Sequence, residues 1–122
     1  MPTDLDRAIE ATPARLTADD GPLSLSYVEK YGEKLPYLTK APANLTDYFN
    51  YFCTIHADKE FLVDGEIRLT FGDCLAAARE LAGGLVDGYD LEVGDRVGIA
   101  ARNSANWIIA YMAIIMAGGE SV

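Results

Sequence analysis

The sequence predicts an α/β fold, and three features of the chain predict it. Its 122 residues are 50% hydrophobic and 24% charged, which is typical of one soluble globular unit. From residue 44 onward, segments with the helical spacing of apolar side chains alternate with short β-rich runs. The last segments read as a strand, a helix and the start of a second strand, which together make an incipient parallel βαβ unit.

Residues 1–43 are predicted to be a lead-in segment of short helices joined by turns. All five prolines of the chain lie in this segment, and proline interrupts regular structure. A first amphipathic helix is expected around Leu5 and Ile9, and Ser26 is placed to cap a second helix around Val28. The segment either packs on a larger body or acts as an arm that contacts a partner subunit.

A longer amphipathic helix is expected over residues 45–55, because apolar and aromatic side chains recur there at helical spacing. Asn44 or Thr46 supplies its N-cap. The aromatic stripe indicates a core face rather than a ligand groove. His56 is the only histidine and follows the end of this helix, with no metal-ligand set or catalytic partner around it in the sequence.

A β-hairpin is predicted over residues 61–71. Two short runs rich in β-branched and aromatic residues flank Asp64-Gly65. This pair accepts the positive φ angles of a tight turn, so the turn is expected there.

A helix is predicted to follow over residues 71–86. Thr70 and Asp73 approximate a capping box at its start, although Asp is shorter than the usual Glu or Gln. A glycine pair at 83–84 weakens this helix, which suggests that another backbone packs closely there. Gly88 is a natural stop for it.

A buried strand and an apolar helix are predicted next. Residues 96–101 are nearly continuous in apolar character, which favours a strand buried on both faces. Asn103 and Ser104 supply cap chemistry for a helix over residues 105–117, and a glycine pair ends it. This helix is apolar almost all round, so other elements must cover it on several sides.

A return strand begins at Glu120 and is expected to pair in parallel with residues 96–101 through a right-handed crossover. Only three residues follow the glycine pair, whereas strands usually have four or more. We therefore expect the 122 residues to be a piece of a longer chain, cut within this unit.

Charge and composition exclude several classes of function. The chain has 10 Lys and Arg against 19 Asp and Glu, and its net charge of −9 argues against nucleic acid or an anionic membrane as a partner. The longest uncharged apolar run is too short for a transmembrane segment, and the acidic N-terminus lacks the order of a secretion signal. Cys53 and Cys74 indicate core thiols of a reducing compartment. The expected location is the cytoplasm.

Sequence motifs that carry catalytic chemistry are missing from the 122 residues. There is no phosphate-binding loop, no G-x-G-x-x-G, no H-E-x-x-H and no G-x-S-x-G. The glycine pairs at 83–84 and 118–119 lack the lysine or the spaced glycines of a phosphate cradle. We therefore predict no catalytic, cofactor-binding or metal-ligating residue in this span.

Four short motifs occur in a fixed order over residues 57–122. They are Leu69-Thr70-Phe71, Gly94-Asp95-Arg96, Asn103-Ser104 followed by Trp107, and Ala117-Gly118. This series resembles the opening of the AMP-forming acyl-CoA synthetases, within the superfamily of adenylate-forming enzymes. The first motif of that family continues with Glu-Leu, where this chain departs with Asp73-Cys74.

The resemblance implies that residues 44–122 are the opening part of the large N-terminal domain of such a synthetase, truncated at residue 122. The parent enzyme would activate a fatty or aromatic carboxylic acid with ATP and Mg²⁺ to an acyl-adenylate, and then form a CoA thioester. In the family, the residues that bind ATP and catalyse the reaction come later in the chain. The resemblance therefore implies that the matched motif residues are structural, that the fragment alone is inactive, and that its partner is the remainder of the synthetase.

Two alternatives stay open. Arg102 or Asn103 lies at the carboxyl end of a predicted strand, where open α/β sheets bind ligands. The chain could instead be a non-enzymatic truncated paralogue or docking module, which pairs with a separate catalytic chain through its open sheet edge and apolar helix. Homo-oligomerisation also stays open.

Overall fold

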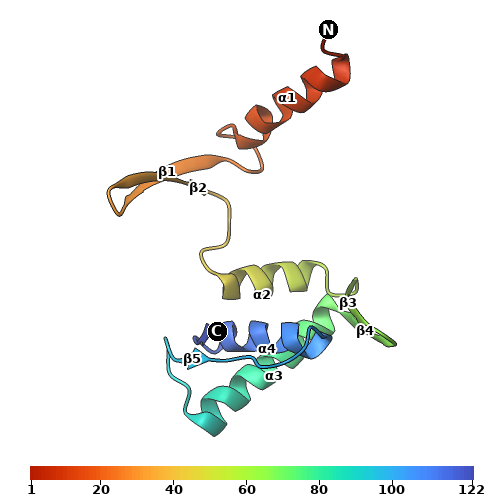
Figure 1. The fold of residues 1–122 in the computed structure, drawn as a ribbon, viewed down its shortest axis with the longest axis vertical. Coiled ribbons are helices and arrows are strands. Elements are labelled where there is room, and N and C mark those ends of the chain that lie inside the picture. The colour runs from red at the N-terminus through yellow and green to blue at the C-terminus, as the bar shows by residue number, and fades with distance from the viewer. The chain divides into compact units, whose positions relative to one another are not determined.

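The computed structural model describes residues 1–122, which form two compact units, Met1–Ala41 and Pro42–Val122 (Figure 1). The first unit holds one helix and a β-hairpin, and the second holds three helices, another hairpin and a short parallel strand pair. The predicted α/β class is confirmed. No helix combines the length and the apolar character needed to cross a bilayer.

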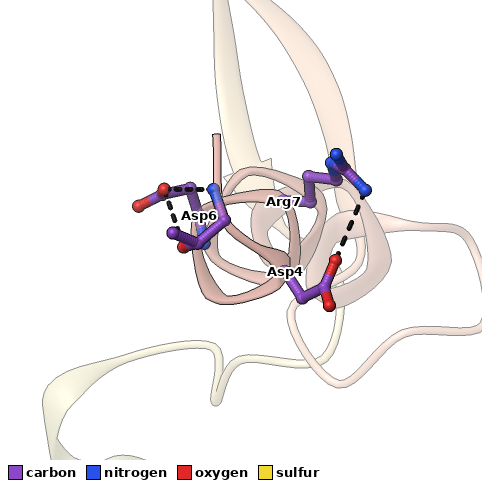
Figure 2. Close-up of polar contacts among 4 residues, drawn as sticks. Asp4, Asp6 and Arg7 are labelled. Carbon is purple, nitrogen blue, oxygen red and sulfur yellow. Dashed lines mark hydrogen bonds and ion pairs between the residues drawn. The ribbon is translucent and has the colours of Figure 1, made fainter. Parts of the chain in front are cut away.

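In the first unit, α1 (Asp4–Thr17) begins at a capping box that sequence reasoning missed (Figure 2). Thr3 Oγ1 accepts a hydrogen bond from the Asp6 N–H at 3.2 Å, and the Asp6 carboxylate accepts one from the Thr3 N–H at 2.7 Å. The Thr3 N–H and the Thr3 hydroxyl both donate to the Asp6 carboxylate, and these two hydrogen bonds lower the pKa of the Asp6 carboxyl. Arg7 Nη1 lies 3.3 Å from Asp4 Oδ1 in an exposed ion pair.

The second half of this unit is a β-hairpin, so the prediction of a second helix capped by Ser26 is wrong. β1 (Leu25–Lys30) and β2 (Glu33–Leu38) are antiparallel. Tyr31 and Gly32 join them with φ angles of 56° and 79°, the backbone of a type I′ turn. The helical spacing of apolar residues around Val28 is short. The Tyr-Gly turn aligns two six-residue strands in one ladder, so strand pairing is favoured over a helix here.

In the second unit, α2 (Leu45–Ile55) is found where it was predicted. Asn44 is its N-cap, and Asn44 Oδ1 accepts a hydrogen bond from the Asp47 N–H at 2.8 Å. Thr46, the other candidate cap, donates its hydroxyl to the carbonyl oxygen of Ile115 at 3.3 Å. This hydrogen bond connects the start of α2 to Ile115, near the C-terminus of the chain.

β3 (Glu60–Asp64) and β4 (Ile67–Thr70) form the predicted hairpin, but the turn lies one residue further along the chain. Asp64 still pairs across the ladder, so the two turn residues are Gly65 and Glu66. Of these two, Gly65 alone has a positive φ, of 61°, which is typical of a type II′ turn. Asp64 thus stays in the strand.

α3 (Phe71–Tyr89) begins at the predicted capping box. Thr70 Oγ1 accepts a hydrogen bond from the Asp73 N–H at 3.1 Å, and the Asp73 carboxylate accepts one from the Thr70 N–H at 2.9 Å. The predicted stop at Gly88 is wrong. The helix continues to Tyr89. Asp90 then takes the left-handed conformation, with a φ of 51°, and is the C-cap in place of the glycine.

The predicted close approach of another backbone to Gly83 and Gly84 is also wrong. No atom outside the local helix lies within 4 Å of the space that a Cβ would occupy at either position. α3 packs through a different face, which includes the buried side chains of Leu75, Ala78 and Ala82.

β5 (Arg96–Val97) and β6 (Glu120–Ser121) pair in parallel, as predicted. The strand is much shorter than the predicted residues 96–101, and it is not buried on both faces. Burial alternates instead along residues 97–100, from half-buried to exposed. β6 is its single neighbouring strand, so one edge of β5 is unpaired, and the alternation indicates that one face of this segment is covered better than the other.

α4 (Ala105–Met116) connects these two strands. Ser104, and not Asn103, is its N-cap, and the Ser104 hydroxyl oxygen accepts a hydrogen bond from the Trp107 N–H at 3.2 Å. Every residue of α4 except Asn106 is buried or half-buried. This confirms that the apolar helix is covered on several sides.

The core of the second unit lies where α2, α3 and α4 meet (Figure 1). It is made of Cys53, Leu75, Ala78, Ala82, Met112 and Ala113. Cys53 and Cys74 are free thiols and both are buried, as predicted. The assignment of residues 1–43 as a lead-in and of residues 44–122 as the opening of a larger domain stays a prediction.

Candidate functional site

Two of the four sequence motifs come together where β5 and β6 begin. The Gly94 N–H donates to the Gly118 carbonyl oxygen at 2.9 Å, and the Glu120 N–H donates to the Asp95 carbonyl oxygen at 2.7 Å. Arg96 Nε lies 3.6 Å from Glu120 Oε2 in an exposed ion pair, which contributes little to stability. Backbone hydrogen bonds therefore join these motifs, which are far apart in the sequence.

Glycine is required at this junction for two separate reasons. Gly94 and Gly118 have φ angles of 92° and 89°, which side-chain-bearing residues rarely adopt. A Cβ at Gly118 would also lie 3.0 Å from Val93 Cγ2, and one at Gly119 would lie 3.1 Å from Ile114 Cγ2. The Ala117-Gly118 motif thus sits at a point of close packing.

The Leu69-Thr70-Phe71 motif joins the β3–β4 hairpin to α3. The Phe71 ring stacks on the Phe61 ring, with a centroid distance of 4.3 Å and an interplanar angle of 16°. The Thr70 hydroxyl, followed by the Thr70 backbone N–H, lowers the pKa of the Asp73 carboxyl. Asp73 departs from the family's Glu at this point and nevertheless completes the capping box.

The start of α4 involves a residue that sequence reasoning assigned only to a turn. Asp64 Oδ2 accepts a hydrogen bond from the Ala105 N–H at 3.1 Å, across 41 residues of sequence. A carboxylate at a helix N-terminus is favoured by the helix dipole. Ser104 caps the same helix, and the Trp107 ring stacks on the Tyr111 ring at 5.8 Å with an interplanar angle of 5°. No local sequence signal links Asp64 to α4.

A pocket of about 250 Å³ lies beside this helix start. Residues 62–64, residues 103–105 and Ile108 line it, so Asn103 borders the pocket whereas Arg102 does not. The carboxylate described above already occupies the helix N-terminus, and an anionic ligand would meet a like charge there. Contact between Asn103 and a ligand stays a prediction.

A larger groove of about 440 Å³ runs between the end of α3 and β5. It is lined by Leu85, Tyr89, Leu91, Asp95, Arg96 and Val97. Its volume lies within the range of small-molecule sites, and its lining is mainly apolar.

The two cysteines and the histidine of the second unit take part in packing. Burial raises the pKa of the Cys53 thiol and raises the pKa of Cys74 to about 11, so both are protonated at neutral pH. His56 packs against Phe71 at a centroid distance of 5.8 Å. No group of three or more His, Cys, Asp or Glu side chains is placed to hold a metal ion.

Comparison with known proteins places this unit in a family. The family described as AMP-binding enzyme matches residues 49–122, which is more than half of the chain. The chain belongs to the family of AMP-binding enzymes. All four motifs lie within the matched residues, and the resemblance to adenylate-forming enzymes is confirmed. Residues 1–48 of this AMP-binding family member lie outside the match.

Solved structures of adenylate-forming enzymes share the fold. An anthranilate CoA ligase in complex with anthranoyl-AMP is 22% identical, with a TM-score of 0.61 over 68% of this chain and 16% of its own. Coronafacic acid ligase from Pectobacterium brasiliense is 22% identical, with a TM-score of 0.60 over 64% of this chain and 15% of its own.

A third structure is an artificially fused adenylation–PCP di-domain of a nonribosomal peptide synthetase from Klebsiella oxytoca. It is 22% identical, with a TM-score of 0.61 over 65% of this chain and 15% of its own. No curated protein matches the chain. In these solved structures, the part that matches this chain is about one sixth of the length.

Proposed function

We propose that this chain is the opening segment of a ligase that activates a carboxylic acid with ATP to an acyl-adenylate. The observation that carries the proposal is the family match over residues 49–122, with all four motifs in order inside it. The anthranilate CoA ligase gives further support, because its structure contains anthranoyl-AMP, a product of this type of activation. The chain covers 16% of that ligase, so the reacting groups would come from other parts of the enzyme.

The proposed acceptor of the acyl group is CoA, and the proposed substrate is a fatty or aromatic acid. The structural relatives include CoA ligases and also adenylation domains joined to a PCP domain. Residues 58–61 and the Asn103-Ser104-x-x-Trp107 motif look more like those of fatty or aromatic acyl-CoA ligases. We propose that the parent enzyme acts in fatty or aromatic acid metabolism, and that it does so in the cytoplasm.

We propose that ATP, Mg²⁺ and CoA are held by other parts of the enzyme. No acidic cluster is placed to hold a metal ion. A helix N-terminus is a common phosphate site, but the N-terminus of α4 already receives the Asp64 carboxylate. We therefore assign this span a structural part, which is to form the β5–β6 strand pair and the helices packed on it.

Pyrophosphate release tests the proposal in two proteins, the 122-residue chain and the product of the complete open reading frame that encodes it. Each is incubated with ATP, Mg²⁺ and a panel of fatty and aromatic acids. We expect acid-dependent release from the complete product and none from the 122-residue chain. Release from the short chain at a comparable rate would contradict the structural role. No release from the complete product with any acid would contradict the ligase.

A second assay separates the two acceptors. The complete product is given CoA or a phosphopantetheinylated carrier protein after adenylation, and thioesters are identified by mass spectrometry. We expect an acyl-CoA. Transfer to the carrier protein alone would contradict CoA as the acceptor and would leave the adenylation step intact.

A further inference from the structure

The outer edge of β1 carries backbone groups that no other strand uses. β1 pairs with β2 alone. The Thr39 N–H donates to the Ser24 carbonyl oxygen at 2.9 Å, so Ser24 and Thr39 extend the ladder as a hydrogen-bonded pair. Hydrogen-bonded and non-hydrogen-bonded pairs alternate along an antiparallel ladder. The N–H and C=O groups of Leu25, Tyr27 and Glu29 therefore point away from β2.

The outer edge of β2 differs because it contains a proline. The same alternation directs the backbone nitrogens of Lys34, Pro36 and Leu38 away from β1. Pro36 has no N–H, and its ring occupies the place where an added strand would pair. The hairpin thus has one blocked edge and one complete edge.

The hairpin also exposes large apolar side chains on both of its faces. Their exposed fractions range from 38% for Leu35 to 55% for Tyr27. By the alternation of a strand, Tyr27 and Leu38 lie on one face, and Val28, Leu35 and Tyr37 lie on the other. An isolated two-stranded hairpin is marginally stable in water, and a third strand or packing against a helix is needed for independent stability.

We propose that β1 pairs with the β1 strand of a second copy of this chain, which gives a four-stranded antiparallel sheet across a twofold axis. In the register centred on Tyr27, Tyr27 lies opposite its counterpart and Leu25 of each copy lies opposite Glu29 of the other. The outward N–H and C=O groups of all three residues then meet as hydrogen-bonded pairs. The two Tyr27 rings come together on one face, and aromatic cross-strand pairs stabilise sheets.

Charge and symmetry favour a second copy as the occupant. In this register Glu29 faces Leu25 and Lys30 faces Ser24, so no like charges lie opposite each other. Moving the axis two residues toward the turn would place Glu29 opposite Glu29, which is unfavourable. Both outer edges of the four-stranded sheet would be β2, where Pro36 prevents further growth. The assembly therefore closes at two copies.

Two proline substitutions on one rung of the hairpin test this interface. Glu29→Pro removes an outward N–H from β1, and Lys34→Pro removes one from β2 directly across the ladder. Neither removes a hydrogen bond within the hairpin. By sedimentation velocity over a series of concentrations, we expect a dimer for the unchanged chain and for Lys34→Pro, and a monomer for Glu29→Pro. Circular dichroism checks that both variants keep the same strand content.

A second variant and a second measurement cover the case in which Glu29→Pro disturbs the hairpin. Tyr27→Lys keeps the backbone N–H but places two ammonium groups at the centre of the interface, so we expect it to abolish the dimer. Amide hydrogen exchange should be slow at Leu25, Tyr27 and Glu29 in the dimer and fast in this variant. A chain that stays monomeric at all concentrations, or a dimer that both proline variants weaken equally, would overturn the proposal. Neither outcome bears on the ligase, since catalysis is not measured.

Discussion

α1 and α3 begin with the same capping box and differ in how much they bury. Each starts at a Thr followed three residues later by an Asp, and the carboxylate accepts the Thr N–H at 2.7 Å in α1 and at 2.9 Å in α3. α1 nevertheless buries no residue, whereas α3 buries four. The cap therefore fixes where each helix begins, while packing decides how much of the stability depends on the helix.

The same contrast separates the two parts of the sequence. The core residues lie within residues 49–122, the part that matches the AMP-binding enzymes. Residues 1–48 lie outside the family match. The first unit has local hydrogen bonds and tight turns, but its one buried polar side chain, Ser24, is not accompanied by a buried apolar cluster.

The largest expected effect is the loss of core packing. Met112→Ala removes a side chain that is 1% exposed at the junction of the three helices, and a cost of about 2–5 kcal/mol in the free energy of unfolding is expected. Ile9→Ala in α1 is the matched change at a side chain that is 61% exposed, with an expected cost below about 0.5 kcal/mol. Urea unfolding followed by Trp107 fluorescence measures the cost of Met112→Ala, and urea unfolding followed by circular dichroism measures the cost of Ile9→Ala. Similar costs would mean that α1 is covered in solution.

A smaller effect is expected at two glycines with similar backbone angles. Gly118 and Gly32 have φ angles of 89° and 79°, and an alanine in this conformation costs about 1–2 kcal/mol. At Gly118 the added Cβ also meets Val93 Cγ2 at 3.0 Å, whereas nothing lies within 4 Å at Gly32. We therefore expect Gly118→Ala to lower the melting temperature more than Gly32→Ala does. Equal shifts would argue against close packing at the β5–β6 junction.

The caps themselves provide the direct test of the comparison. Thr70→Ala should cost about 1 kcal/mol in the unfolding of the second unit, because α3 is part of its core. Thr3→Ala removes the same cap from α1 and should lower only the helical content measured by circular dichroism. If Thr3→Ala also shifted the unfolding seen by Trp107, α1 would contribute to the stability of the second unit.

The fold could be predicted from the sequence wherever local chemistry determines it. Asn44 and the Thr70–Asp73 pair combine a cap with a long apolar repeat, and both helix starts are confirmed. The Thr3–Asp6 pair has the same chemistry, but the apolar repeat that follows it is weak, so the sequence does not single out this pair as a helix start. Tyr31-Gly32 was missed because the strands on either side are not strictly alternating, and because Tyr-Gly is not among the favoured type I′ pairs such as Asn-Gly and Asp-Gly.

The contacts within the candidate site, in contrast, could not be predicted from local sequence. The order of the motifs was enough to predict the family, yet the contacts between motifs could not be read from spacing. Gly94 and Gly118 meet through a backbone hydrogen bond, and Asp64 reaches Ala105 across the fold. Such contacts depend on the arrangement of α3, α4 and the strands, and no local pattern encodes them.

The smallest expected effect is the pH dependence of the second capping box. Hydrogen bonds from Thr70 hold the pKa of the Asp73 carboxyl below its ordinary value of 3.8, so the folded state favours the charged form. The stabilisation is therefore complete above the unfolded-state pKa and is lost as the pH falls through the lower folded-state pKa. Urea unfolding of the unchanged chain and of Asp73→Asn should differ at neutral pH and converge only as the pH falls through the folded-state pKa, which lies below 3.8. Asp6→Asn is the matched control in α1 and should leave the unfolding of the second unit unchanged at every pH. A difference between the unchanged chain and Asp73→Asn that persists at low pH would show that the carboxylate charge is not what stabilises the start of α3.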